Sequence, residues 1–273
     1  MQKNTLWGSI WKNGLLLVYT IFSLFPLFWM FIMTLKDDRE MFTTTFFFTP
    51  TLENYHRVLL FSDYYKNFRD NLIVSAGAVA ISVLVGVPAA YVLARYKFKR
   101  KEGLAFQLLS YKFAPEILVV LPLFKIFQSL GLYDTYLGLI WVYQLISLPL
   151  LVWVCRGYFE DISEEIEYAA KVDGYGWFQI FWRILIPLVK PGIVAAALLS
   201  FIFAWNNFTF PLILAGFQIS TVTIAALSFI SATTVHFGQM AVAALISVTP
   251  SIIFALIIQK HLVRGLSFGA VKG

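Results

Sequence analysis

The sequence predicts an all-α membrane protein with six transmembrane helices and no separate soluble domain. Apolar residues make up 59% of its 273 residues, and charged residues only 13%. A soluble chain of this size could not bury so much apolar surface in one core, because its exterior needs polar cover. Several apolar runs also exceed the roughly 20 residues that cross a hydrocarbon core about 30 Å thick.

Six apolar segments are the expected membrane spans, and together they form one transmembrane domain over residues 14–259. The first segment is too long for the apolar region of a signal peptide, so we expect it to be retained. Prolines inside the segments do not argue against them, because neighbouring helices can satisfy the freed backbone groups. The spans run approximately over residues 14–35, 71–94, 104–124, 136–155, 192–215 and 239–259.

The positions of lysine and arginine predict the orientation. These residues gather in the loop after the second span, in the loop after the fourth and near both ends of the chain. Because short loops rich in them stay in the cytoplasm, the ends, 1–13 and 260–273, are predicted to be cytoplasmic. Residues 217–235 are apolar enough for a seventh span, but a crossing there would put the basic C-terminus outside. We interpret 217–235 as an external or re-entrant segment and 36–70 as an external connection.

Composition also disfavours several classes of function. Cys155 is the only cysteine, so the chain has neither a disulfide framework nor a clustered metal-ligand spacing. The net charge of +6 is not gathered into a stripe with stacking aromatic residues, so we expect no nucleic acid partner. A membrane-bound enzyme is disfavoured because the spans hold no cluster of His, Asp or Cys. A secondary transporter would usually show internal half-repeats and more intramembrane ionisable residues.

The fourth and fifth spans are joined by residues 160–191, which are long for a connector and lie on the predicted cytoplasmic side. Asp161 or Ser163 can cap a helix there. The first turn of that helix would hold Glu164 and Glu165, which are favourable at the positive end of the helix dipole. The loop therefore has a helix of its own.

Two interpretations of this helix remain open. Ile166, Ala169 and Ala170 fall on one face at helical spacing, and Gly174 is a natural stop before a second amphipathic segment that begins at Trp177. The pattern fits a helix–turn–helix under the bilayer whose small-residue face is exposed for docking. It fits equally an interfacial amphipathic helix that only anchors the loop.

The spacing in this loop carries a family resemblance. Ala169-Ala170 is followed after three residues by Gly174 and, after nine more, by Ile184-Leu185-Ile186-Pro187. This resembles the EAA loop of ABC importer permeases, with the pattern Glu-Ala-Ala, three residues, Gly, nine residues, Ile-x-Leu-Pro. Asp173 completes the Asp-Gly pair usual in the sugar-type branch. Tyr168 stands where the family has its glutamate, and Glu167, one place earlier, points about 100° away around a helix.

Other segments extend the resemblance over roughly residues 70–273. Residues 115–123 (PEILVVLPL) and 130–139 (LGLYDTYLGL) are similar to the third span and the following loop of that branch. Trp205-Asn206-Asn207-Phe208 with Pro211 resembles its fifth span. The C-terminus, LVRGLSFGAVKG, closely resembles the tail of maltose-transporter-type permeases. The resemblance thus implies the permease fold of type I ABC importers.

The family resemblance implies a division of labour. Such importers have two membrane subunits, here expected to be a heterodimer, two cytoplasmic ATPases and an external solute-binding protein, all at the inner membrane of a prokaryote. ATP and Mg²⁺ are expected on the partner ATPase, because this chain has no G-x-x-x-x-G-K-[ST] phosphate loop and needs no cofactor of its own. The tail, ending at Gly273, is expected to reach towards the nucleotide-binding dimer.

The resemblance also implies that the EAA helix sits in a cleft of the ATPase and transmits its closure to the spans. The residues expected to take part in this coupling are Glu164, Glu167, Tyr168, Ala169, Ala170, Asp173, Gly174, Ile184 and Pro187.

Polar residues within the spans are candidates for a solute path. Lys112 and Glu116 lie four residues apart in the third span, and the simplest interpretation is a mutual i,i+4 pair or a lysine that reaches the cytoplasmic surface. Asn206 and Asn207, next to Trp205, have the chemistry to bind a sugar, since amides bond hydroxyls and aromatic faces cover C–H groups. The alternative is helix packing through interhelical hydrogen bonds.

The predicted function is import of a sugar or sugar-like solute by alternating access, powered by a partner's ATP hydrolysis. Within the same class, the solute could instead be a polyol, a glycerol phosphate or an oligosaccharide. An autonomous secondary transporter is the less favoured alternative.

Overall fold

The computed structural model describes residues 6–230 and 235–269, and these residues are almost entirely helical. The only strand-like pairing within the described ranges is an isolated bridge between Ile230 and Val235. The helices are α1 (Leu6–Leu35), α2 (Glu53–Leu60), α3 (Tyr64–Arg95), α4 (Lys101–Ser110), α5 (Glu116–Ser129), α6 (Tyr136–Val142), α7 (Gln144–Glu160), α8 (Glu164–Val172), α9 (Trp177–Gln179), α10 (Ile186–Trp205), α11 (Thr209–Leu214), α12 (Val222–Ala225) and α13 (Phe237–Gly269). The C-terminal end of the expected tail, 270–273, lies outside the described residues.

Four helical stretches are long and apolar enough to cross a membrane, and two bent helix pairs raise the number to six if each pair is one span. The four stretches are Trp11–Leu35, Tyr64–Arg95, Trp177–Trp205 and Phe237–Gln259. The bent pairs are Lys101–Phe113 with Glu116–Ser129, at 91°, and Tyr136–Val142 with Gln144–Glu160, at 44°. The described residues are therefore helical in architecture and contain four to six membrane-length apolar helices.

Both bends have identifiable causes. Ala114 precedes Pro115 and adopts an extended ψ of 131°, because the proline ring disfavours helical backbone at the preceding residue. At the second bend, the side-chain amide of Gln144 donates to the carbonyl of Ile140, 3.0 Å away. A side chain that bonds to the helix ladder is a common cause of a bend.

The fifth apolar segment begins earlier than the sequence pattern suggests. α9, a π-helical turn over Ile180–Leu185 and α10 form one helical stretch, so Trp177 and Pro187 belong to the same run. Pro187 does not end a separate amphipathic helix; it lies in the first turn of α10. The wide turn precedes this proline, and such turns relieve the strain that a proline puts on a regular helix.

The described chain forms two compact units. One contains residues up to 65 together with 225–248, and the other contains 66–224 and the residues from 249 onward. In the first unit, the side-chain amide of Asn54 donates to the carbonyls of Thr34 and Lys36, at 3.1 and 2.8 Å. These bonds fix α2 against the end of α1.

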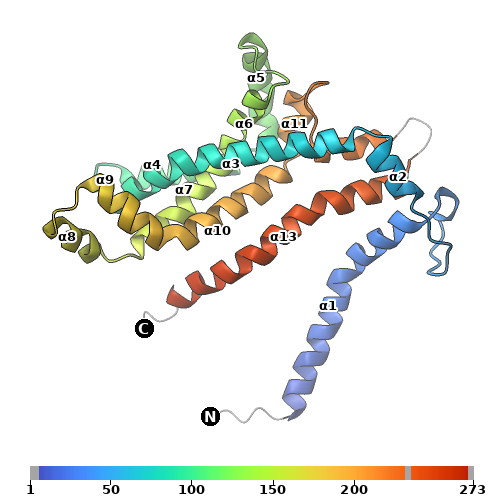
Figure 1. Cartoon of the computed structure of the whole chain (residues 1–273), viewed down its shortest axis with the longest axis horizontal. Helices are drawn as coiled ribbons and strands as arrows, with labels where there is room; N and C mark the ends of the chain where they lie inside the picture. The colour runs from blue at the N-terminus through green and yellow to red at the C-terminus, as the bar shows by residue number, and fades with distance from the viewer. Residues whose placement is uncertain (1–5, 231–234, 270–273) are drawn as a thin grey trace. The chain divides into compact units, whose positions relative to one another are not determined.

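The second unit is built around α3, α7 and α10, which run side by side (Figure 1). α10 packs along most of α7, and Gly192 allows the closest approach, because a Cβ atom there would collide with the ring of Tyr158. One apolar cluster joins these helices with α8 and the π-helical turn, and a second joins α3 with α5, α6 and α11. The two clusters position the sites described below.

In residues 215–230, the part of the segment after α11 that the structure describes without a gap, the helical turns are short. α12 has four residues and is followed by a 3-10 turn over Ala226–Phe229, so neither is long enough to cross a membrane as a helix. Before them, the carboxylate of Asp134 accepts the backbone N–H groups of Gly216, Gln218 and Ile219 at 2.8–3.0 Å. These bonds hold the start of the segment against the end of α5.

Candidate functional site

Helix α8 has a defined cap at each end. The hydroxyl of Ser163 accepts the backbone N–H of Glu165, which makes Ser163 the N-cap. At the other end, Tyr175 donates to the carbonyl of Ala170 and Gly174 to that of Lys171, at 3.0 and 3.1 Å. This is the Schellman arrangement, and Gly174 takes the positive φ of 86° that it requires. The predicted stop at Gly174 is therefore present.

The two faces of α8 differ from the predicted pattern. Ala170 is buried in the apolar cluster, whereas Ala169 is exposed, so the two alanines do not share a docking face. Adjacent residues on a helix point about 100° apart, and the buried stripe is Glu167 with Ala170, three places on. The outer surface of the helix carries Glu164, Ile166, Tyr168, Ala169, Val172 and, just beyond its end, Asp173.

Glu167 is buried and already has partners within the chain. Its carboxylate accepts from the guanidinium of Arg95 at 2.6 Å and from the hydroxyl of Tyr91 at 2.9 Å. Arg95 also donates to the carbonyl of Ile162 at 2.7 Å, and its side chain and that of Glu167 are each 8% exposed. These bonds tie α8 to the C-terminal end of α3. The carboxylate therefore faces the protein and not a partner's surface.

This anchor could not be recognised from the sequence. Arg95 was interpreted only as one of the basic residues that orient the second span, and Tyr91 as part of that span. The one sequence feature that points to the anchor is a glutamate, Glu167, one residue before the position where the family has its own. A cleft of about 150 Å³ between α3 and α8 is lined by these three residues together with Tyr168 and others.

Tyr168, at the position of the family's glutamate, is 57% exposed. Its hydroxyl donates to the carboxylate of Glu164 at 3.2 Å, and the amine of Lys171 lies 5.3 Å from the centre of its ring. The hydrogen bond to the Glu164 carboxylate raises the pKa of the Tyr168 hydroxyl. The outer face of α8 thus presents an aromatic ring held between an acid and a base.

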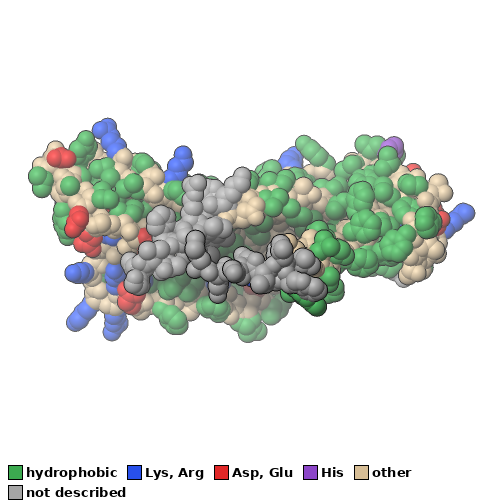
Figure 2. All heavy atoms as spheres, turned by 90° about the horizontal axis from the view of Figure 1, so that it is seen from below, with side chains coloured by type: hydrophobic (Ala, Val, Ile, Leu, Met, Phe, Trp, Pro, Cys, Tyr) green, Lys and Arg blue, Asp and Glu red, His purple; other side chains and the backbone are tan. Residues whose placement is uncertain are grey.

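The second half of the loop motif lies in the π-helical turn and the start of α10. Leu185 is fully buried in the first cluster, Ile184 is half-buried beside it, and Pro187 is exposed. The side chain of Gln179 accepts the backbone N–H of Gly176 at 3.1 Å and closes the turn between the two helices. Figure 2 shows acidic and basic side chains gathered at the end of the second unit that holds α8.

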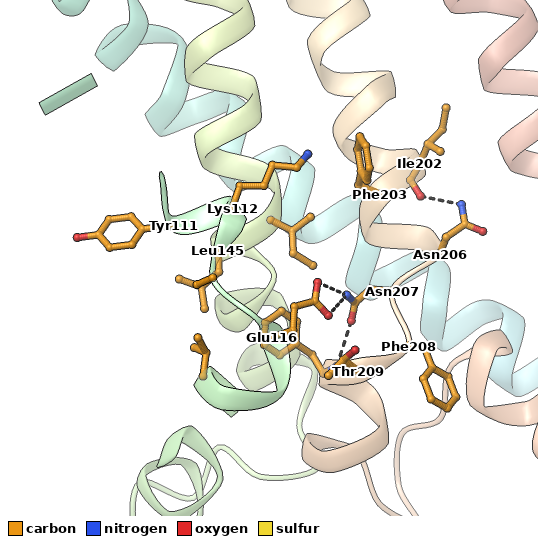
Figure 3. A pocket seen from close by; sticks show the side chains of 14 residues that line it. Tyr111, Lys112, Glu116, Leu145, Ile202, Phe203, Asn206, Asn207, Phe208 and Thr209 are labelled. Carbon is orange, nitrogen blue, oxygen red and sulfur yellow. Dashed lines mark hydrogen bonds between the residues drawn. The ribbon is translucent and has the colours of Figure 1, made fainter. Parts of the chain in front are cut away.

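A cavity of about 570 Å³ lies between the helix break at Pro115 and the short connection that joins α10, which ends at Trp205, to α11. Four of the five residues predicted on a solute path line it: Lys112, Glu116, Asn206 and Asn207. Figure 3 shows the carboxylate of Glu116 pointing at the side chain of Asn207, whose Nδ2 lies 3.0 and 2.9 Å from the two carboxylate oxygens. Asn207 is buried, and its own Oδ1 accepts the backbone N–H of Phe210 at 3.1 Å.

The expected i,i+4 pair of Lys112 and Glu116 is wrong. The break at Ala114–Pro115 puts the two residues on different helical segments, so the helical spacing between them is lost. The amine of Lys112 lies 3.6 Å from the centre of the Phe203 ring, while Glu116 is held by Asn207. Phe203, which no sequence pattern singles out, is thus part of the cavity wall.

Trp205, the fifth predicted residue, does not face the cavity. Its side chain is buried, with its ring against those of Phe68 and Phe201 at 5.1 and 5.6 Å between centroids. These contacts pack the end of α10 against α3 on the side away from the cavity. Asn206, by contrast, is exposed, and its amide donates to the carbonyl of Ile202 at 2.8 Å and to the hydroxyl of Ser251 at 2.9 Å.

The chain matches a known family over almost its whole length. The model of the family described as "Binding-protein-dependent transport system inner membrane component" matches residues 4–268. The chain belongs to this family. It is therefore a membrane-embedded permease subunit of a binding-protein-dependent ABC importer and not an enzyme. Within the described ranges, no group of three or more His, Cys, Asp or Glu side chains could hold a metal ion.

Curated relatives of this permease are named for sugar transport. It is 34% identical over 260 residues to the trehalose transport system permease protein SugB of Mycobacterium tuberculosis, covering 92% of this chain and 93% of that protein. It is 32% identical to the trehalose/maltose transport system permease protein MalG of Thermococcus litoralis, with 94% of each chain covered. With the diacetylchitobiose uptake system permease protein DasC of Streptomyces coelicolor it shares 27% identity over the full length of both.

A solved structure shares the fold of this permease. The match is to a chain in the crystal structure of a bacterial ABC transporter involved in the import of the acidic polysaccharide alginate, with a TM-score of 0.78 and 22% sequence identity. It covers 95% of this chain and 98% of the other. The helical arrangement is therefore that of an ABC importer permease.

Proposed function

We propose that this permease carries a neutral sugar or oligosaccharide across the inner membrane of a prokaryote as one of two membrane subunits. A second permease subunit, an ATPase dimer and an extracytoplasmic solute-binding protein complete the transporter. The names of the relatives, which include trehalose, maltose and diacetylchitobiose, favour this class over a polyol or a glycerol phosphate. The solute passes by alternating access, driven by the partner's hydrolysis of ATP.

Each bent helix pair is proposed to be one span, which gives six crossings with both termini in the cytoplasm. The bends at 91° and 44° interrupt helix pairs that are together long and apolar enough to cross a membrane. Broken helices inside a membrane are stable where neighbouring protein satisfies the freed backbone groups. The basic residues near the ends and around α8 support the cytoplasmic location of those parts.

Helix α8 is proposed to be the coupling helix that docks on the ATPase. The observation that carries this proposal is its two-sided construction: Glu167 anchors its inner face to Arg95 of α3, while Tyr168 and Ala169 are exposed on its outer face. A partner protein that binds the exposed face of such a helix can transmit its movement to α3 through the buried face. The docking must differ between the two states of the ATPase, because equal affinity for both would shift no equilibrium.

The proposal is tested by Ala169→Trp and Gly174→Asp in the complete transporter reconstituted in liposomes. Both variants should weaken co-purification of the ATPase and lower sugar uptake per ATP hydrolysed, because one enlarges the docking face and the other strains the positive φ at the helix end. Ser129→Trp, which puts the same bulk on an exposed site at the end of α5, should change neither. Normal assembly and uptake in both test variants would refute the coupling role.

The solute path is proposed to run past the cavity lined by Lys112, Glu116, Asn206 and Asn207. Trp205 then acts as a support for this wall, since it packs behind the cavity against Phe68 and Phe201. Polar and ionisable groups are costly within a membrane and usually face a water-filled or protein interior. Their gathering around one cavity is the reason for placing the path here.

A further inference from the structure

The cavity contains the three kinds of group that recognise a sugar. Glu116 offers hydrogen-bond acceptors, Lys112 offers donors, and Phe203 and Phe208 offer exposed aromatic surface. Its volume of about 570 Å³ falls within the range of roughly 300–1,000 Å³ that is typical of small-molecule sites. Figure 3 shows these groups arriving from both sides, with Glu116 after one helix break and Asn207 and Phe208 at the other.

The carboxylate of Glu116 is oriented before any ligand arrives. The side-chain nitrogen of Asn207 bonds both of its oxygens, and Asn207 is itself fixed because its side-chain oxygen accepts the N–H of Phe210 and its carbonyl accepts the hydroxyl of Thr223. An ionised carboxylate has about four acceptor sites. One amide nitrogen shared between the two oxygens therefore leaves acceptor capacity for the hydroxyl groups of a solute.

The charges of the cavity favour a neutral ligand. The ammonium of Lys112 lies over the face of Phe203, where the ring stabilises its charge but accepts none of its conventional hydrogen bonds. Its N–H donors can still reach a sugar oxygen. Because one carboxylate and one ammonium line the same cavity, its formal charge is balanced. A phosphate or uronate group would meet the carboxylate of Glu116.

We propose that this chain binds the solute directly in the cavity, with Glu116 accepting hydrogen bonds from hydroxyl groups of a neutral sugar and Lys112 donating to its oxygens. Asn207 is a positioning residue, because it acts by holding Glu116. This inference rests on the proposed function, which it deepens by giving this subunit its own part in solute recognition. Because Lys112 covers a face of Phe203, the exposed ring of Phe208 is left for the C–H face of the sugar.

The first test measures uptake by the complete transporter in proteoliposomes, with maltose, trehalose and diacetylchitobiose as probes. Glu116→Gln should raise KM about tenfold for the sugar that the wild type transports, as expected for the loss of one charged hydrogen bond. It should leave ATP hydrolysis stimulated by the binding protein largely unchanged, because Gln still offers Asn207 an acceptor. Glu102→Gln, which removes a carboxylate outside the cavity on the same bent pair, should keep the wild-type KM.

The second test reports on binding without transport. In a Cys155→Ala background, Thr209→Cys puts the only thiol of this chain in the cavity wall, and labelling of this subunit is followed in the permease–ATPase complex. Millimolar amounts of the transported sugar should slow its reaction with a maleimide, glucuronic acid should not, and protection should be lost when Glu116→Gln is added. Wild-type KM in Glu116→Gln, or equal protection with and without Glu116, would overturn the inference while leaving the importer intact. No uptake of any probe by the wild type would contradict the proposed sugar function itself.

Discussion

At the scale of single residues, two carboxylates organise the two sites for which we propose functions. Glu167 joins α8 to α3 through Arg95, and Glu116 joins two helix breaks through Asn207. Glu167 is buried with its partners, whereas Glu116 is half-buried and also faces the cavity. A buried charge is strongly destabilising once one of its partners is removed.

We expect Glu167→Gln to weaken the attachment of α8. Loss of the charged bond to Arg95 should cost about 3 kcal/mol, because the pair is buried and the guanidinium would be left uncompensated. Uptake per ATP hydrolysed should fall even in complexes that assemble. Thermal unfolding of the purified complex and coupled transport assays measure the two effects.

The matched control is Glu165→Gln, an exposed carboxylate on the same helix. It should leave both stability and coupling at wild-type values. A reversed pair, Arg95→Glu with Glu167→Arg, should recover part of the stability lost by either single change. Full coupling in Glu167→Gln would show that α8 needs no link to α3.

At the scale of elements, the second unit is held together by close packing of helices. α10 meets α7 where Gly192 lies against the ring of Tyr158, so the two backbones approach more closely than larger side chains would permit. Within membranes, small residues allow such contacts where no hydrophobic effect drives helices together. α10 forms one helical stretch with α9 and the π-helical turn. This stretch, Trp177–Trp205, runs from the loop that contains α8 to the cavity.

We expect Gly192→Ala to separate α7 from α10. The added methyl group would collide with the ring of Tyr158, and overpacking of this kind costs about 1–3 kcal/mol. The melting temperature of the purified complex should fall. Adding Tyr158→Ala should restore much of the lost melting temperature, because it makes room for the methyl group. Gly103→Ala, at a glycine with open space around it, should leave the melting temperature nearly unchanged. Unchanged stability in Gly192→Ala would argue against this close contact.

At the scale of the whole molecule, the six-span topology makes opposite predictions for two exposed sites. Phe217 follows the fifth apolar stretch and should face the outside, whereas Asp173 lies at the end of α8 and should face the cytoplasm. In intact cells that express the permease with Cys155→Ala, a membrane-impermeant maleimide should label Phe217→Cys but not Asp173→Cys. Permeabilised cells should allow labelling of both. Labelling of Asp173→Cys in intact cells would invert the topology and remove the basis for ATPase docking.

The sequence by itself determined the class of the protein, the apolar segments and the helical loop with its stop at Gly174. These features are local: they depend on the length of apolar runs, the placement of lysine and arginine, and a glycine, which takes a positive φ without steric cost. The family likewise followed from the spacing of a few residues in that loop. Local patterns could also suggest Lys112, Glu116, Asn206 and Asn207 as a group.

Only the tertiary structure decided which of these residues meet. Glu116 and Asn207 are 91 residues apart, and Arg95 and Glu167 are 72 apart, so no periodicity relates either pair. The bend before Pro115 separated Lys112 from Glu116 and turned each towards a partner on α10 or at its end. Helical spacing predicts neighbours only while the helix continues, and the sites of this permease lie where helices break or where separate helices meet.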